Sequence, residues 1–195
     1  MTDLPAQRVL LECVAVIDQQ GISYAVMGGF AVRAWGIPRP TFDADVAVVV
    51  NGEQWAALLS SLEAEGFDVP SEHSTGFLDK LGPFQKAKVS RFYEGFVWST
   101  DLFIVGDSFL ESAVSRARRA VIGGVTVRVM APEDIVLLKL IAGRRKDLAD
   151  IDEILMVSTT LDRSYLDKWA ARLGIADRLA DILPREAPPN PDKGV

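Results

Sequence analysis

The sequence predicts an α+β fold in which strands and helices mix first and a purely helical segment follows. Apolar runs of strand type recur up to residue 129, and glycine turns such as Gly123-Gly124 separate them. Amphipathic helical stretches lie between these runs, and from Pro132 onward only helical periodicity remains. Hydrophobic residues make up 49% of the 195 residues and charged residues 25%, a balance typical of a globular protein with its own core.

Periodicity and turn residues give the expected elements in order. Helices are expected over residues 5–19, around 31–35, and over 53–65, 132–143, 146–157, 163–173 and 175–183. Strands are expected over residues 23–27, 41–50, 84–92, 95–105, 119–122 and 125–129. The second strand ends in a run that is apolar on both faces, so it belongs in the centre of a sheet. The polar stretch 67–82 is expected to be a loop, and a hairpin is expected to turn at Glu94-Gly95.

The change of character near residue 131 divides the chain. Residues 1–131 are expected to form the core, and residues 132–183 a helical segment packed on it. Residues 184–195 contain several prolines and are expected to form a flexible tail.

Charge and cysteine content exclude several classes. A net charge of −6 argues against binding nucleic acid by bulk attraction to phosphate, although it allows a local basic pocket. Cys13 is the only cysteine, which excludes an intrachain disulfide and a cysteine-based zinc site. No apolar run reaches the length of a membrane span, and the charged N-terminal stretch is unlike a signal peptide, so we expect a cytoplasmic protein without a membrane partner.

The candidate site rests on three aspartates and a glycine pair. Asp43 and Asp45 are two residues apart in an expected strand, so they project from one face and repel each other unless a cation neutralises them. Hard divalent cations such as Mg²⁺ prefer such oxygen ligands. Gly28-Gly29 follows a strand and opens a helix, where backbone N–H groups approach an anion closely. Asp101 lies inside an apolar strand, where an ionised carboxylate needs a partner.

Each feature also has a purely structural interpretation. Asp43 and Asp45 are compatible with solvated residues at a strand end, and the glycines with a tight turn. Asp101 is compatible with a core aspartate paired with a nearby Arg or Lys. His73 is interpreted as a surface residue of a polar loop, and the arginines after residue 115 as the solvated start of a strand, namely Arg116, Arg118 and Arg119.

Taken together, these residues resemble the nucleotidyltransferase superfamily of the DNA polymerase β type, and most of all its minimal bacterial members such as the AbiEii-like toxins. The resemblance covers roughly residues 20–155 and is carried by Gly28, Gly29, Arg39, Thr41, Asp43, Asp45 and Asp101. Pro132-Glu133-Asp134 and Lys146-Asp147-Leu148-Ala149-Asp150 are similar to helical motifs of that group. Many relatives have Gly-Ser in place of Gly28-Gly29, and a branched residue in place of Ala44.

The resemblance implies a mixed β-sheet flanked by helices and a set of site residues. It implies that Asp43, Asp45 and Asp101 are catalytic and hold two Mg²⁺ ions, and that Gly28 and Gly29 cradle the triphosphate of a bound nucleotide such as ATP. Arg39 and the cations near the second motif are expected to contact phosphate, these cations being Lys139, Arg144 and Lys146. A solvated helix face is the alternative for these cations, and stacking on Trp35 for Arg39.

The implied activity is Mg²⁺-dependent transfer of a nucleoside monophosphate from an NTP to a hydroxyl acceptor. The AbiEii likeness implies a toxin of a toxin–antitoxin system that acts on RNA such as a tRNA end, with an antitoxin protein as partner. A small-molecule acceptor, as in the aminoglycoside and lincosamide nucleotidyltransferases, is the enzymatic alternative. A catalytically silent scaffold that binds a nucleotide or a protein is the alternative from another class.

Overall fold

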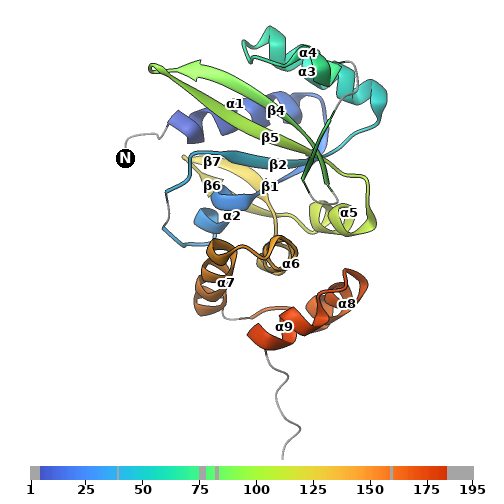
Figure 1. Ribbon diagram of the computed structural model, residues 1–195. Coiled ribbons are helices and arrows are strands. Elements are labelled where there is room, and N and C mark those ends of the chain that lie inside the picture. Colours follow the sequence, from blue (N-terminus) through green and yellow to red (C-terminus); the bar gives the residue numbers. More distant parts are fainter. Residues whose placement is uncertain (1–4, 39, 75–77, 82–83, 159, 184–195) are drawn as a thin grey trace, which may run out of the picture.

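The computed structural model describes residues 5–38, 40–74, 78–81, 84–158 and 160–183, which form a mixed sheet flanked by helices (Figure 1). Its seven strands follow the order β3-β4-β5-β2-β1-β7-β6. They are β1 Ser23–Met27, β2 Ala44–Val49, β3 Asp79–Leu81, β4 Phe84–Tyr93, β5 Phe96–Ile104, β6 Arg118–Ile122 and β7 Val125–Val129. Strand β1 is antiparallel to β2 and parallel to β7, while β2 is parallel to β5. The expected mixed α+β class is therefore confirmed.

Helices cover both sides of this sheet. Those of the first part of the chain are α1 Pro5–Gln19, α2 Gly28–Ala34, α3 Gly52–Ala64, α4 Ser71–Ser74 and α5 Ser108–Ser115. The C-terminal ones are α6 Pro132–Ala142, α7 Arg145–Val157, α8 Arg163–Arg172 and α9 Ala176–Ile182. Helices α1 and α3 lie on one side, and α2, α5 and the C-terminal helices on the other (Figure 1). None of the helices in the described part of the chain is both long and apolar enough to cross a bilayer.

Local sequence signals explain where the helices begin and end. Asn51 caps α3 with a capping box, and Asp107 caps α5 by accepting two backbone hydrogen bonds. Pro132 opens α6, and Gly143 ends it with φ of 63°, a left-handed conformation that favours glycine. The strand ends agree as well, because the β4–β5 hairpin turns at Glu94-Gly95.

Some expectations about the elements were wrong. The stretch 67–82, expected to be a loop, contains α4 and β3, and α5 was not expected at all. His73 is 3% exposed, and its Nε2 accepts a hydrogen bond of 3.2 Å from the Lys88 backbone N–H, so it supports the edge of β4. The tail 184–195 lies outside the described residues.

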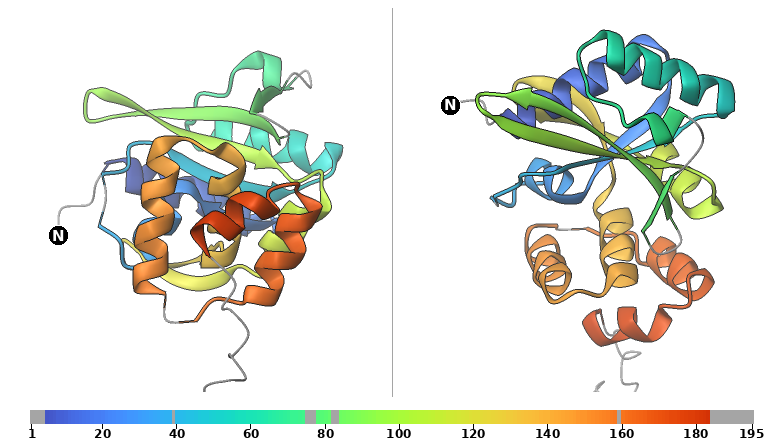
Figure 2. Two further views of the ribbon diagram at one scale, coloured as in Figure 1. Left: turned by 60° about the horizontal axis from the view of Figure 1, so that its bottom comes forward. Right: turned by 45° about the horizontal axis from the view of Figure 1, so that its top comes forward.

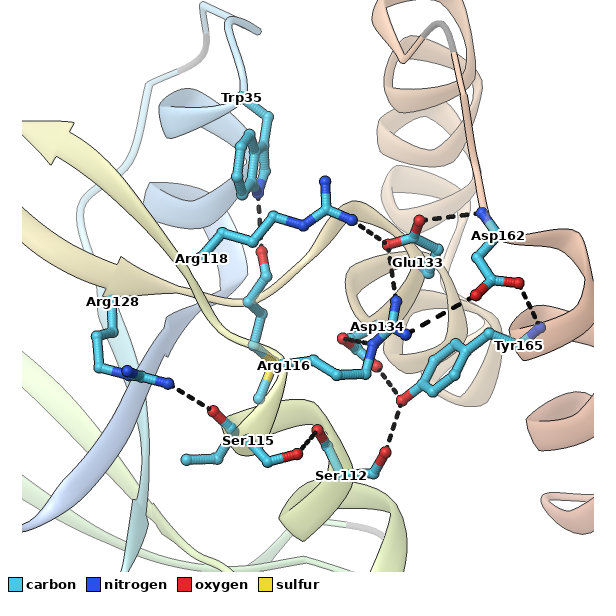
Figure 3. Close-up of polar contacts among 12 residues, drawn as sticks. Trp35, Ser112, Ser115, Arg116, Arg118, Arg128, Glu133, Asp134, Asp162 and Tyr165 are labelled. Atoms are coloured by element: carbon cyan, nitrogen blue, oxygen red, sulfur yellow. Dashed lines mark hydrogen bonds and ion pairs between the residues drawn. The ribbon is translucent and has the colours of Figure 1, made fainter.

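A polar network, here called the Arg116 network, joins the sheet part of the molecule to the C-terminal helices (Figure 3). Its members are Arg116, Glu133, Asp134, Asp162 and Tyr165. The Arg116 guanidinium lies 3.4 Å from Glu133 and 3.6 Å from Asp134, and its Cζ lies 3.6 Å from the Tyr165 ring centroid. Arg116 is therefore not the solvated residue expected, whereas Arg118 is exposed as expected and also pairs with the buried Glu133.

Tyr165 closes this network, and its hydroxyl is expected to stabilise the fold. It donates a hydrogen bond of 2.6 Å to the buried Asp134. Replacing Tyr165 by Phe leaves that carboxylate short of a donor, so we expect the free energy of unfolding in urea to fall by about 1–3 kcal/mol. Tyr93→Phe is the matched control, because among the described residues the hydrogen-bond partner of the Tyr93 hydroxyl is the exposed Arg8. Equal effects of the two substitutions would contradict the stabilising role.

Asp134 gives the network a dependence on pH. Burial raises the pKa of Asp134 to about 6 from 3.8, against the opposing effects of the Tyr165 hydroxyl and Arg116, and Glu133 raises it further. The folded protein therefore holds the proton more tightly than the unfolded chain, and the contribution to stability is lost as the pH rises through about 6. We expect the loss of unfolding free energy from pH 5 to pH 7 to be smaller by about 1 kcal/mol in Asp134→Asn than in the wild type. Identical pH profiles in urea denaturation would contradict this.

Candidate active site

The parallel pairing of β2 with β5 brings two of the three predicted aspartates together. Asp45 and Asp101 are direct partners in the register, so their side chains leave the same face of neighbouring strands. Asp43 lies in the turn just before β2 and is exposed, with Oδ1 accepting a hydrogen bond of 3.5 Å from the Ser99 hydroxyl of β5. All three carboxylates thus lie at one end of the β2–β5 pair.

Asp45 is the electrostatically unsatisfied member of the group. Among the described residues its carboxylate has no hydrogen-bond or ion-pair partner, and it is half-buried. Burial, followed by repulsion from Asp101 and Asp43, raises the pKa of Asp45 to about 6. A cation bound there would relieve this cost, since it favours the ionised carboxylate.

Gly28 packs directly against this carboxylate. Its φ is +61°, and a Cβ added there would lie 2.0 Å from Asp45 Oδ2. A Cβ on Gly29 would meet the Thr41 side chain at 2.8 Å. Both positions therefore require glycine, because a larger side chain would collide with Asp45 or Thr41. The backbone of this turn borders the Asp45 carboxylate.

Asp101 differs from Asp45 because it already has cationic partners. It is 8% exposed, and the Lys86 ammonium contacts its Oδ2 while the Lys88 ammonium lies 2.8 Å from its Oδ1. The core interpretation of Asp101, with a lysine partner, therefore describes its contacts. Neither lysine was singled out from the sequence, although their two-residue spacing on a strand opposite Asp101 is a usable signal.

A pocket of about 350 Å³ opens beside Asp45, between the sheet and the helices α6 and α7. Figure 2 shows these helices as a layer against the side of the sheet that carries α2. Apolar side chains of the sheet and α6 form most of the wall, among them Met27, Phe84, Phe103, Ile135 and Leu138. The charged groups of the wall are Asp45, Lys139, Arg144 and Asp147.

Of the predicted cations that the structure describes, Lys139 and Arg144 line this pocket and Lys146 does not. The buried Lys139 contacts Asp150 and lies 3.6 Å from Asp147, and Arg144 Nε lies 2.7 Å from Asp147. Lys146 is exposed and does not line the pocket. Arg39 lies outside the described residues.

The carboxylates fit one divalent cation better than two. The described residues contain no group of three or more His, Cys, Asp or Glu side chains placed to hold a metal by themselves. Mg²⁺ commonly takes one or two carboxylates and completes its shell with water and substrate phosphate. Asp45 with Asp43 meets that requirement, because Asp45 has no ion-pair partner in the part of the chain that the structure describes, whereas both oxygens of Asp101 face lysines.

Gly28 provides a direct test of the close approach to Asp45. We expect Gly28→Ala to lower the free energy of unfolding by about 1–3 kcal/mol more than Gly21→Ala, because only the former forces a methyl group into a carboxylate. Gly21 is the matched control, since its φ of +65° carries the same backbone strain and nothing lies within 4 Å of an added Cβ. Chemical denaturation of both variants measures the difference, and equal losses would mean that Asp45 is not packed on Gly28.

Comparison with known proteins agrees with this geometry. Residues 101–174 match the family model described as nucleotidyl transferase of unknown function (DUF2204). The match begins at Asp101 and includes α6, α7 and α8. No curated protein matches the chain.

Solved structures resemble the whole chain. A nucleotidyltransferase-like antigenic protein from Paracoccidioides brasiliensis has 22% identity and a TM-score of 0.57, with coverage of 92% of this chain and 88% of that one. ANT(2'')-Ia in complex with adenylyl-2''-tobramycin has 15% identity and a TM-score of 0.53, covering 86% and 96%. The lincosamide antibiotic adenylyltransferase LnuA, lincomycin-bound, has 11% identity and a TM-score of 0.53, covering 80% and 98%. These likenesses show that the chain has the fold of nucleotidyltransferase-like proteins, and residues 101–174 carry the match to a nucleotidyl transferase family.

Proposed function

We propose that the protein transfers a nucleoside monophosphate from an NTP to a hydroxyl acceptor at the β2–β5 carboxylates. The observation that carries the proposal is the pairing of Asp45 with Asp101 on neighbouring strands, beside a glycine turn and a pocket that contains cations. In the reaction, the acceptor oxygen forms a bond to the α-phosphorus and the bond to pyrophosphate breaks.

The residues of the pocket have separate roles in this proposal. The backbone of Gly28 and Gly29 borders the phosphates, where larger side chains would collide with Asp45 and Thr41. Arg144 lies on the pocket wall and contributes positive charge toward the phosphates, with Lys139 behind it in contact with Asp147 and Asp150. Asp101 lies next to Asp45 and accepts the proton that the acceptor hydroxyl loses.

Mg²⁺ is the cofactor that the carboxylates favour. Asp43 and Asp45 would hold it, because Asp45 has no ion-pair partner among the described residues, and burial, then repulsion from Asp101 and Asp43, raise its pKa. When bound, Mg²⁺ neutralises phosphate charge and orients the donor nucleotide.

A small hydroxyl-bearing molecule is the acceptor we favour. The net charge of −6 disfavours a long RNA partner, and a pocket of about 350 Å³ with mainly apolar walls suits small ligands. Two proteins of similar fold also have small-molecule ligands in their solved structures. ANT(2'')-Ia is in complex with adenylyl-2''-tobramycin, and LnuA is lincomycin-bound. A toxin that modifies RNA and is held by an antitoxin is the second candidate.

The proposal is tested with α-³²P-labelled NTPs, Mg²⁺ and separate pools of aminoglycosides, lincosamides and total RNA. We expect label to appear in a small-molecule pool and to fall by at least about 100-fold in Asp45→Asn and Asp101→Asn. Asp177→Asn on α9 is the matched control, because that aspartate is exposed and outside the pocket.

The other outcomes separate the alternatives. Label in RNA alone would favour the toxin. Transfer that persists in both aspartate variants would overturn the proposed mechanism. Nucleotide binding without transfer to any pool would favour a silent scaffold.

A further inference from the structure

The surroundings of Asp101 point to an unusual way of balancing charge at the site. The two lysines that contact Asp101 stand two residues apart on β4, so both leave the same face of the strand. Lys88 is the direct register partner of Asp101, and Lys86 is the partner of Phe103. Backbone pairing in the β4–β5 hairpin therefore fixes the points from which both side chains leave the sheet.

The two lysines differ in how firmly they are held. The Lys86 side chain is 16% exposed against 45% for Lys88. The Lys86 ammonium lies 6.0 Å from the Phe103 ring centroid, and Phe103 in turn packs edge-on against Phe84. Lys88 also contacts the Ser99 hydroxyl at 3.2 Å, and Ser99 contacts Asp43. Lys86 is thus the more fixed cation, while Lys88 connects Asp101 with the remaining carboxylates.

The charge on Lys86 and Lys88 can be compared with the charge of a metal ion. Two ammonium groups carry the same total charge as one divalent cation, and each forms an ion pair with one oxygen of Asp101. A divalent ion bridging Asp45 and Asp101 would have to displace Lys86 from a mostly buried contact and leave its ammonium without its carboxylate partner. Because such an unpaired buried charge is costly, the lysines oppose an ion in that position.

We propose that Lys86 and Lys88 take the place of a second divalent ion at Asp101, so that the active site uses one Mg²⁺, at Asp43 and Asp45. This inference rests on the proposed nucleotidyl transfer. Lys86 is a positioning residue here, because it acts through Asp101 and holds that carboxylate beside the acceptor.

Mn²⁺ binding tests the inference with the full chain. The protein is loaded with Mn²⁺ and an ATP analogue that has a methylene bridge between the α and β phosphorus atoms. Two Mn²⁺ ions about 4 Å apart, as in two-metal sites, give a spin-coupled signal in electron paramagnetic resonance that a single ion lacks. We expect one uncoupled Mn²⁺ in the wild type, and a coupled pair in Lys86→Met or in the double variant with Lys88→Met.

A matched control and the opposing outcomes complete the design. Lys168→Met on α8 removes an exposed lysine that does not line the pocket, and the variant is expected to keep the uncoupled signal. A coupled pair in the wild type would overturn the inference and leave the proposed function intact, as would failure of both variants to gain a second ion. Failure of the wild type to bind the Mn²⁺–analogue complex, together with absence of transfer, would overturn the proposed function and the inference with it.

Discussion

The site depends on the parallel pairing of β2 with β5. These strands are far apart in the sequence, because α3, α4, β3 and β4 lie between them. The register places Asp45 directly beside Asp101, and a shift by one residue would turn one of the two carboxylates to the other face. Val46, Ala47 and Val48, which follow Asp45 in β2, are buried, and their burial makes such a shift costly. The core thus fixes the geometry of the acids.

Helix α6 completes the pocket and is held at both ends. Glu133 and Asp134, in its first turn, belong to the Arg116 network, and Lys139, in its last turn, contacts Asp147 and Asp150 of α7. Ile135 and Leu138, between these ends, form part of the pocket wall. The Pro-Glu-Asp and Lys-Asp-x-x-Asp motifs noted in the sequence therefore fix α6 and α7 relative to the sheet. Their polar groups shape the pocket even where they do not line it.

The sequence predicted the elements better than it predicted their contacts. Helix and strand periodicity located α1, β1 and the β4–β5 hairpin, because amphipathic patterns and glycine stops are local signals. The helix α5 was missed, although Asp107 supplies a cap. The contacts of Arg116 and Arg118 with Glu133 are not visible in the sequence, because these residues meet only after the chain has folded.

The surroundings of the carboxylates show the same limit. The Asp43 and Asp45 spacing was visible in one strand, whereas the Lys86 and Lys88 contacts with Asp101 required the register of a hairpin. That register follows from a turn at Glu94-Gly95, since counting outward from the turn pairs Lys88 with Asp101. The role of each carboxylate still could not be assigned from the sequence, because burial and partners decide which one is unsatisfied.

The charged groups around the pocket form two ion-pair clusters and one pair of neighbouring carboxylates. Asp101 is a carboxylate held by two ammonium groups, and Lys139 is an ammonium group held by two carboxylates. In each cluster the opposite charges compensate the buried member, although Asp101 Oδ1 has an ion-pair contact without a hydrogen bond. In the described part of the chain neither Asp43 nor Asp45 has an ion-pair partner, and their combined charge equals that of one divalent ion in magnitude. An exchangeable cation therefore gains most at Asp45, because burial and repulsion from Asp101 and Asp43 raise the pKa of that carboxyl group.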